Sequence, residues 1–320
     1  MTTVSVAIPI LNGARVLERT LRAVREQRLD DRISVELLVC DSGSSDESVA
    51  VARRHGAEVI QIRPPEFSHG GTRNLLMQRA AGDYVAFLTQ DAVPADQCWL
   101  SRLLYGFSHA ADVALVFGPY LPAPDASVMV ARELNDWFAK LSPDGLPRVD
   151  HLAPEERDLT ARELFGPRAY FTDANGCVSR AAWQSVPFRP VAYAEDHALA
   201  VDMLRYGYAK VFVPDAGVVH SHDYSPLEWL RRAFDESRSL HDVYGFAEPL
   251  EPRRVGLKLW GLVKADWQWA ASHGDQQSLG LLGRSAGHHL LRTTGAVLGG
   301  RASRLPAPIT SRLSLEGRPG

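Results

Sequence analysis

Small polar and acidic residues follow four apolar runs in the first 120 residues, a pattern that could bind a phosphorylated nucleotide together with a cation. The four segments are Pro9-Ile10-Leu11-Asn12, Asp41-Ser42-Gly43-Ser44-Ser45-Asp46, Phe67-Ser68-His69-Gly70-Gly71-Thr72-Arg73-Asn74 and Thr89-Gln90-Asp91-Ala92. If the apolar runs are parallel strands, these segments gather at one edge of the sheet, where ligands of such sheets bind. Their coincidence therefore predicts a ligand site at that edge.

The second and third segments offer groups suited to a base and to phosphates. The Asp41 carboxylate could accept a hydrogen bond from a pyrimidine N3–H, with the amides of Ser42 to Ser45 nearby. Gly70-Gly71-Thr72 opens a predicted helix, and glycine-rich helix starts attract phosphate, to which Arg73 could add a charge-assisted contact. The alternative interpretations are a helix N-cap cluster at Asp41 and a turn with a surface arginine at Arg73.

Asp91 and two histidines could contribute to a cation site. One or two carboxylates suffice for a hard divalent cation when phosphates and water supply the other oxygens. His220 and His222 follow another strand-like run, and imidazole is a common metal ligand. A turn acid and structural histidines are the alternatives.

The elements that must position these residues alternate between strands and helices. Predicted strands cover residues 4–9, 35–40, 57–62 and 84–88, and helices between them include 48–55 and 72–81. Strands that are apolar on both faces and alternate with helices predict an α/β fold with a mostly parallel sheet of doubly wound type.

The second half of the chain is predicted to be less regular, with several long helices. Expected helices cover 131–141, 195–206 and 225–244, strand-like segments cover 169–172 and 211–214, and a tryptophan-rich helical stretch follows. Glu195 and Asp196 begin one of these helices, but acids suit any helix start, so their position alone does not indicate a function.

Composition limits the function classes. The 320 residues carry 45% hydrophobic and 23% charged residues and a net charge of -3, which is typical of a globular protein and argues against a protein that coats nucleic acid. From Arg253 onward there are 10 Lys+Arg and 3 Asp+Glu, so this tail is +7 and the preceding residues are -3 - 7 = -10. The two parts are therefore expected to face different partners.

Cysteine usage and hydropathy predict a cytosolic protein. Cys40, Cys98 and Cys177 are widely spaced, which predicts neither a disulfide framework nor a zinc site and favours a reducing compartment. The start of the chain does not resemble a signal peptide, and no apolar run reaches the ~18 residues of a membrane span.

The combined motifs resemble a known enzyme family. Ile8-Pro9-Ile10-Leu11-Asn12, the Asp41–Asp46 loop, Asp91 before Pro94, and Glu195-Asp196 look like the inverting family 2 glycosyltransferases of GT-A fold. The segments Phe67–Asn74, Leu88–Ala92 and His220-Ser221-His222-Asp223-Tyr224-Ser225 resemble the bacterial rhamnosyltransferase branch. The resemblance covers residues 4–245.

The resemblance implies a single displacement that inverts the anomeric carbon. Asp196 would be the catalytic base that deprotonates the acceptor, and Glu195 would orient it or shape the acceptor site. Asp91 and His220 would hold Mg²⁺ or Mn²⁺ to neutralise the departing nucleoside diphosphate. Thr89 stands at the position of the first acid of the family's usual Asp-x-Asp motif, and the rhamnosyltransferase branch that this chain resembles shares the form Thr89-Gln90-Asp91. The implied nucleotide-sugar contacts are Pro9, Ile10, Asn12, Asp41, Ser42, Gly43, Ser44, Gly70, Gly71, Arg73, Asn74 and Gln90.

The expected domain organisation follows from this resemblance. Residues 1–120 would form the donor half, 121–245 the acceptor half with the base, 246–305 a basic helical tail, and 306–320 a disordered end. Trp260, Trp267 and Trp269 among the basic residues of the tail would suit either the inner face of an anionic membrane or an oligomer contact.

The resemblance leaves several functions open. The expected donor is dTDP-rhamnose and the expected acceptor a cell-envelope glycan or lipid-linked glycan; a UDP-hexose or UDP-N-acetylhexosamine on the same scaffold is the nearest alternative. A sugar-phosphate nucleotidyltransferase usually carries a glycine-rich loop with arginine after its first strand, where this chain has Pro9-Ile10-Leu11-Asn12-Gly13. A non-catalytic nucleotide-sugar-binding scaffold is a third possibility, although the acids Asp41, Asp91 and Asp196 are all present.

Overall fold

The computed structural model describes residues 2–191 and 193–315, which divide into two compact units. The first, here called the sheet unit, comprises the residues up to Leu121 together with Trp137–Leu159 and Leu164–His220. The second, here called the helical unit, comprises Pro122–Asp136, Thr160–Glu163 and the residues from Ser221 onward. The chain therefore passes between the units several times.

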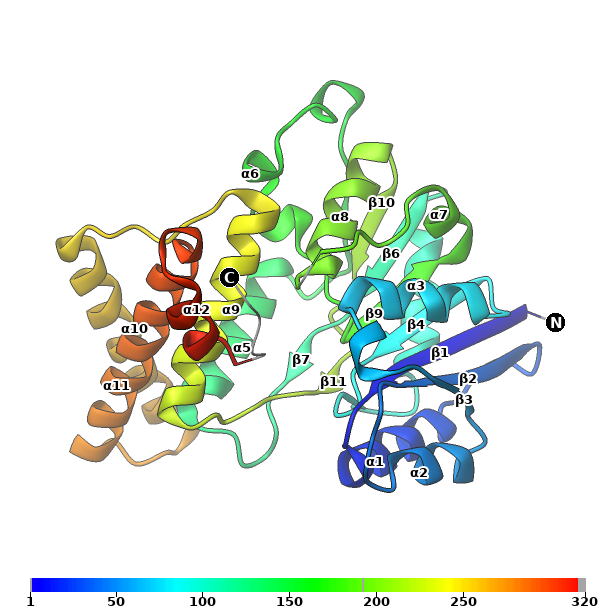
Figure 1. Cartoon of the computed structure of the whole chain (residues 1–320), viewed down its shortest axis with the longest axis horizontal. Helices are drawn as coiled ribbons and strands as arrows, with labels where there is room; N and C mark the ends of the chain where they lie inside the picture. Colours follow the sequence, from blue (N-terminus) through cyan, green and yellow to red (C-terminus); the bar gives the residue numbers. More distant parts are fainter. Residues whose placement is uncertain (1, 192, 316–320) are drawn as a thin grey trace. The chain divides into compact units, whose positions relative to one another are not determined.

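The sheet unit is built on an eight-stranded sheet with the order β3-β2-β1-β4-β9-β6-β10-β8 (Figure 1). Strands β3, β2, β1 and β4 are parallel to one another, as are β6 and β10, whereas β9 runs antiparallel between β4 and β6. The strands are β1 (Thr2–Ile10), β2 (Ile33–Asp41), β3 (Glu58–Gln61), β4 (Tyr84–Leu88), β6 (Val113–Phe117), β8 (Arg148–Asp150), β9 (Asn175–Ser179) and β10 (Ala209–Phe212). This mixed, mostly parallel α/β sheet confirms the predicted fold class.

Helices cover both faces of this sheet. On one face, α1 (Ala14–Arg25), α2 (Ser48–Arg54) and α4 (Trp99–Gly106) share a core with the side chains of β1. The apolar positions Leu17, Leu21 and Val24 of α1 recur at helical spacing, so they bury one stripe of that helix. The other helices of the unit are α3 (His69–Arg79), α6 (Ala161–Leu164, shared with the helical unit), α7 (Arg180–Ser185) and α8 (Glu195–Tyr206).

A second, three-stranded sheet of very short strands has the order β5-β11-β7. Its strands are β5 (Val93–Pro94), β11 (Val218–Val219) and β7 (Tyr120–Leu121). Gly118 lies just before β7, and a Cβ at that position would overlap the carbonyl oxygen of Ala216. Only glycine therefore allows the segments before β7 and β11 to approach this closely.

The helical unit consists of the first part of α5 (Val128–Leu141) with α9 (Pro226–Tyr244), α10 (Pro252–His273), α11 (Leu279–Gly299) and α12 (Ala307–Leu313). Helix α9 starts with the Ser225–Glu228 capping box and Pro226 at its first position, as its sequence predicts. In the helical unit, α9 packs along α11. None of the helices in the described ranges is long and apolar enough to cross a membrane.

Several expectations about the second half need correction. Residues 169–172 form no strand: Pro167–Ala169 is a 3₁₀ turn, and Phe171 is buried against Phe117. The strand is β9, six residues later, because β4 and β6 pair with it from both sides. Strand β6 itself had not been predicted.

The expected boundaries also differ from the structure. The compact units do not divide at 120 and 245, because 122–136 and α9 belong with the C-terminal helices. The end expected to be disordered contains α12, which is started by Pro306 and buries Thr310; residues 316–320 lie outside the described residues.

Candidate active site

The segments after β1, β2 and β4 meet at the carboxyl edge of the sheet, as predicted. The Asn12 amide donates to Ser44 Oγ at 2.9 Å, and the Ser45 amide donates to Asn12 Oδ1 at 2.8 Å. Gln90 clamps the same loop: its Oε1 accepts from the Leu11 amide at 2.9 Å and its Nε2 donates to the Leu11 carbonyl at 3.2 Å. These bonds fix three loops relative to one another.

Asp41 lies at the floor of this edge and is 1% exposed. Its Oδ1 accepts from the Ser44 amide at 3.0 Å, and its Oδ2 is met by Gln61 Nε2 at a longer 3.3 Å. The Ser42 hydroxyl donates to the Ile10 carbonyl at 3.1 Å. Asp46, and not Asp41, accepts from the amide of Ser48 at the start of α2, so the N-cap alternative does not describe Asp41.

The remaining residues of these loops shape the backbone. Pro9 lies within β1, where it pairs with Cys40 of β2. Gly43 has φ +102°, and a Cβ at this position would overlap the ring of Pro64. Asn12 has φ 48°, a left-handed conformation that asparagine tolerates better than most residues. The loop is therefore held in a strained but defined shape.

The small second sheet brings Asp91 and His220 together. Val93 of β5 pairs with Val219 of β11, so the residue two positions before β5 faces the residue just after β11. Asp91 Oδ1 lies 3.5 Å from His220 Nδ1, and their side chains are 25% and 14% exposed. A carboxylate oxygen and an imidazole nitrogen thus converge from residues far apart in the sequence.

A buried ion cluster forms between the start of α3 and the start of α8. Arg73 Nη1 lies 2.8 Å from Glu195 Oε1, Arg73 Nη2 donates to Asp173 Oδ1 at 2.6 Å, and all three side chains are about 5% exposed or less. The guanidinium that was expected to contact phosphate is thus buried and paired with two carboxylates. A buried charge needs such partners.

Asp196 is the half-buried member of the acid pair. The His197 amide donates to its Oδ1 at 2.8 Å. Burial of the carboxyl and the neighbouring Glu195 raise the pKa of Asp196, although His197 and Arg73 oppose the shift. Ala194, just before the pair, has φ 60°, and non-glycine residues in this region are strained and cluster at functional sites.

Three further predicted phosphate-site residues have packing roles. Asn74 donates to the Phe188 carbonyl at 2.9 Å and accepts from Trp183 Nε1 at 2.8 Å and the Phe188 amide at 3.0 Å. A Cβ at Gly70 would overlap the Arg189 carbonyl, and the Gly71 amide donates to Ser68, the N-cap of α3. These residues hold the segment that leads into α8.

Sequence reasoning missed Tyr120, Thr172 and Asp173. The Tyr120 hydroxyl contacts Thr172 Oγ1, and its ring lies 4.9 Å from that of His220, so it connects the acid cluster with the Asp91–His220 pair. Asp173 directly follows residues 169–172, which had been predicted as a strand. Acids that follow strands gather at one edge of the sheet, and this rule, used for the first four segments, would have identified Asp173.

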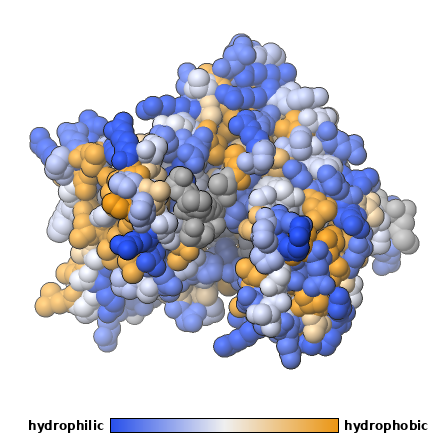
Figure 2. Space-filling view, viewed as in Figure 1, coloured by the Kyte–Doolittle hydropathy of each residue, from blue (hydrophilic) through white to orange (hydrophobic). Residues whose placement is uncertain are grey.

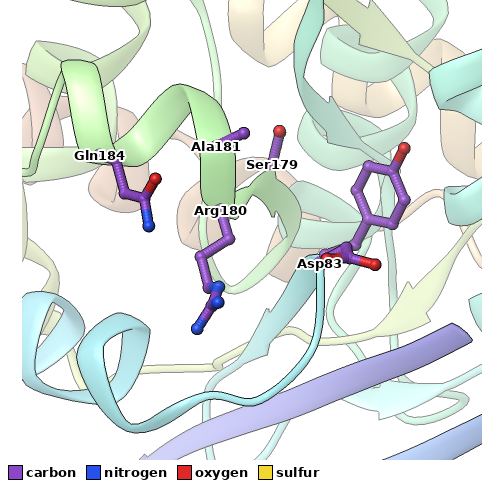
Figure 3. Close-up of a pocket in the computed structure, with 6 residues that line it drawn as sticks. Asp83, Ser179, Arg180, Ala181 and Gln184 are labelled. Atoms are coloured by element: carbon purple, nitrogen blue, oxygen red, sulfur yellow. The ribbon is translucent and has the colours of Figure 1, made fainter.

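A hollow in the described sheet unit lies away from the candidate site. It encloses about 520 Å³ beside Asp83, Tyr84 and the start of α7, at the opposite ends of β4 and β9 from the candidate site. Figure 3 shows Ser179, Arg180 and Ala181 at the start of α7, with Gln184 one turn along. The Arg180 guanidinium donates to the Ala80 carbonyl at 2.7 Å, so this charge is occupied by backbone.

Comparisons with known proteins agree with this arrangement. The family described as Glycosyl transferase family 2 matches residues 5–143. The O-antigen chain rhamnosyltransferase RfbN of Salmonella typhimurium is 30% identical over 237 residues, which are 72% of this chain and 70% of that protein. The glucosyl-3-phosphoglycerate synthase of Mycolicibacterium smegmatis is 30% identical over 232 residues, covering 70% of this chain and 72% of that protein.

A solved structure gives the same fold. The mannosyltransferase PcManGT from Pyrobaculum calidifontis, in complex with GDP-Man and Mn²⁺, superposes with a TM-score of 0.57 at 17% identity, covering 94% of this chain and 86% of that one. With the sheet topology, the motif positions and these relatives taken together, the chain belongs to glycosyltransferase family 2 and is a glycosyltransferase of GT-A fold.

Proposed function

We propose that this enzyme transfers L-rhamnose from dTDP-rhamnose to a hydroxyl of a glycan or lipid-linked acceptor, with inversion by single displacement. The observation that carries the chemistry is the half-buried Asp196, whose pKa is raised by burial and whose neighbour Glu195 is held by the buried Arg73. The similarity to the rhamnosyltransferase RfbN supports the choice of sugar.

In this proposal Asp196 takes the proton of the attacking hydroxyl. A carboxylate with a raised pKa is a stronger base than an exposed aspartate, which suits general base catalysis. Glu195 is turned away by its ion pair with Arg73, so it positions α8 and does not compete for the proton.

Asp91 and His220 are proposed to hold Mn²⁺ or Mg²⁺. Adjacent ligands around an octahedral cation with bonds of roughly 2.1–2.2 Å lie about 3.0–3.1 Å apart, so the 3.5 Å between the donor atoms of Asp91 and His220 would shorten slightly on binding. One oxygen and one imidazole ligand leave room for diphosphate and water. When bound, the cation neutralises the charge that develops on the leaving diphosphate.

The nucleotide is proposed to lie over the loops after β1 and β2. Asp41 Oδ2 has only a long bond from Gln61, so it can accept the N3–H of a thymine or uracil. The backbone around the nucleotide would be that of Ile10, Asn12, Ser42 and Ser44. The proposed donor contacts do not include Gly70, Gly71, Arg73 and Asn74. These residues are engaged in contacts with other parts of the protein.

A panel of nucleotide sugars tests the proposal. The purified enzyme is incubated with dTDP-rhamnose, UDP-glucose, UDP-N-acetylglucosamine and GDP-mannose, with Mn²⁺, Mg²⁺ or EDTA, and the released nucleoside diphosphate is measured. Preferential turnover of dTDP-rhamnose supports the rhamnose assignment, and the anomeric configuration of the product tests inversion. Preferential turnover of another donor would replace the sugar and leave the mechanism in place.

Two alternatives remain open to that experiment. A UDP-hexose donor is favoured by the similarity to a glucosyl-3-phosphoglycerate synthase, which is as identical as RfbN over nearly the same length. A non-catalytic scaffold would bind a donor in thermal-shift measurements without releasing nucleoside diphosphate under any condition.

The basic C-terminal helices are proposed to contact an anionic membrane that carries a lipid-linked acceptor. Lys264 and Arg284 are exposed, as are Leu257 (65%) and Trp260 (68%), and Figure 2 shows hydrophobic surface over this part of the molecule. Of the three tryptophans, Trp267 packs against Ala270 and Leu281, and Trp269 stacks on His273, so Trp260 is the interfacial one. A contact between two copies of the chain is the alternative.

A further inference from the structure

Two adjacent histidines of α11 face an acid of α5 inside the helical unit. The side chains of His288 and His289 are 5% and 1% exposed. His289 Nδ1 lies 3.5 Å from Glu133 Oε1, and His288 Nε2 lies 3.7 Å from Glu133 Oε2. Three donor atoms typical of metal ligands therefore converge within 4.8 Å of one another.

The other ring nitrogen of His289 faces a second acid. His289 Nε2 lies 2.7 Å from Asp266 Oδ2, and Asp266 is fully buried, where it also accepts from Ser285 Oγ at 2.5 Å and from Arg132. A histidine that donates its Nε2 proton to a carboxylate presents the lone pair of Nδ1 on the other side, which is how carboxylates orient metal-binding histidines. In that tautomer the lone pair of His289 Nδ1 faces Glu133 Oε1, so these two hydrogen-bond acceptors oppose each other.

His288 is held without a hydrogen bond at the same place. Its Nε2 is buried and has no hydrogen-bond partner among the described residues, because 3.7 Å to Glu133 is too long for one. Its ring packs edge-on against Trp229 at 4.7 Å, which fixes where the nitrogen points. A buried nitrogen aimed at a carboxylate with a gap between them is the geometry of a ligand.

We propose that Glu133, His288 and His289 form a Zn²⁺ site that fastens α5 to α11, with water as the fourth ligand. Zinc with bonds of ~2.0–2.2 Å in a tetrahedron separates its ligand atoms by roughly 3.3–3.5 Å. The 3.5 Å between His289 Nδ1 and Glu133 Oε1 is close to this separation, and one ligand atom from each of the three residues lies within 4.8 Å of the others. Two imidazoles and one carboxylate are a zinc donor set. The site needs no cysteine, so cysteine spacing does not bear on it.

Arg292 is the cation that competes for Glu133. It contacts Glu133 Oε2, is 30% exposed, and lies over the ring of Trp229 at 5.2 Å. Burial raises the pKa of Glu133, but Arg292 together with His288 and His289 lowers it to about 2. Zinc would release Arg292 toward solvent, so the arginine weakens the metal affinity without closing the site.

The test is zinc binding by the full-length chain after treatment with chelator. Zinc per chain, the dissociation constant and the change in Tm are measured for the wild type and for His288→Ala, which leaves no hydrogen bond broken. His273→Ala, an exposed histidine of α10, is the matched control, and Asp91→Ala removes any zinc at the candidate catalytic pair. Arg292→Gln is the gain-of-affinity variant.

The proposal expects one zinc per chain in the wild type, His273→Ala and Asp91→Ala, with Tm raised by about 4 °C or more. His288→Ala should weaken binding by about 100-fold or more, and Arg292→Gln should tighten it by about 10-fold. Co²⁺ added to the wild type should give the visible absorption of a tetrahedral complex, a readout that does not depend on the folding of any variant. An octahedral Co²⁺ spectrum, or equal affinity in wild type and His288→Ala, would mean that the cluster is an ion network only.

Discussion

Removing the charge of Asp196 separates its chemical role from a structural one. If Asp196 is the base, Asp196→Asn should lower kcat by about 10²- to 10⁴-fold while the affinity for the donor stays unchanged. Because the folded state raises the pKa of this carboxyl, the protein gains nothing from its charge, so the Tm of the variant should equal or exceed that of the wild type. Kinetics, donor titration and calorimetry are compared with Asp158→Asn, an exposed acid of the same unit. Wild-type turnover in Asp196→Asn would remove the assignment.

The same shift predicts the pH dependence of the reaction. The active form of Asp196 is the carboxylate, which is lost as pH falls through a pKa that lies above the ordinary value near 3.9. The acidic limb of kcat/KM against pH should therefore lie above pH ~4. The linked stability has the opposite sign: it is present at low pH and decreases as pH rises through the raised pKa. A limb at or below pH ~4, measured where circular dichroism shows a folded protein, would contradict the shift.

The contributions of Arg73 and Asp173 to the free energy of unfolding should depend on each other. Arg73→Met leaves buried carboxylates without their partner, and losses of this kind destabilise proteins by about 3–5 kcal/mol. Adding Asp173→Leu removes one of the stranded acids and should recover part of that free energy. Urea unfolding of the two single variants and the double variant measures the coupling. Additive effects would mean that the two side chains do not act as a pair.

At the scale of elements, the three-stranded sheet β5-β11-β7 brings together Asp91 and His220, the two proposed cation ligands. Gly118→Ala places a Cβ on the Ala216 carbonyl, so it should lower the free energy of unfolding by about 1–3 kcal/mol and weaken Mn²⁺ binding. Gly256→Ala is the matched control: nothing lies near that position in α10, and the change should stabilise the protein by about 0.5–1 kcal/mol. Equal stability of the two variants would show that the close approach at Gly118 is not maintained.

Local sequence signals predicted the elements whose burial follows a simple pattern. Strand β4 and helix α8 have the predicted bounds, 84–88 and 195–206, because an apolar run bounded by polar residues and a helix ended by Gly207 are specified within the element. Strand β9 begins with Asn175-Gly176, which are poor strand formers, and exists because β4 and β6 pair with it. No local signal could place it.

The candidate site was predictable where it follows from the order of the strands, and not where it depends on contacts between distant residues. The meeting of the loops at Asn12, Ser44 and Gln90 follows from the parallel order of their strands. The partners of Arg73 do not: Asp173 lies 100 residues away, and only tertiary structure shows that the arginine is buried. The partners of Asn74 could not be predicted for the same reason, because Trp183 and Phe188 are distant in sequence.

At the scale of the whole molecule, the uneven charge of the chain allows the proposed membrane contact to be tested. Replacement of Lys264 and Arg284 by glutamate, with Lys258, should reduce co-sedimentation with anionic vesicles by about 10-fold or more, since each basic residue near such a surface contributes about 1 kcal/mol. Binding by the wild type should also fall as salt is raised. Neutral phosphatidylcholine vesicles and a Lys140→Glu variant are the controls. Unchanged binding would favour the oligomer contact, which analytical ultracentrifugation would reveal.

The division of the helical unit along the chain has a consequence for how the protein is made. Its first segment, 122–136, leaves the ribosome long before α10 and α11. Arg132 of this segment pairs with Asp266 of α10, and Glu133 pairs with Arg292 of α11. During synthesis these two side chains are without their native partners until residues 266 and 292 have emerged. Nascent chains stalled before residue 292 should therefore be sensitive to protease around α5.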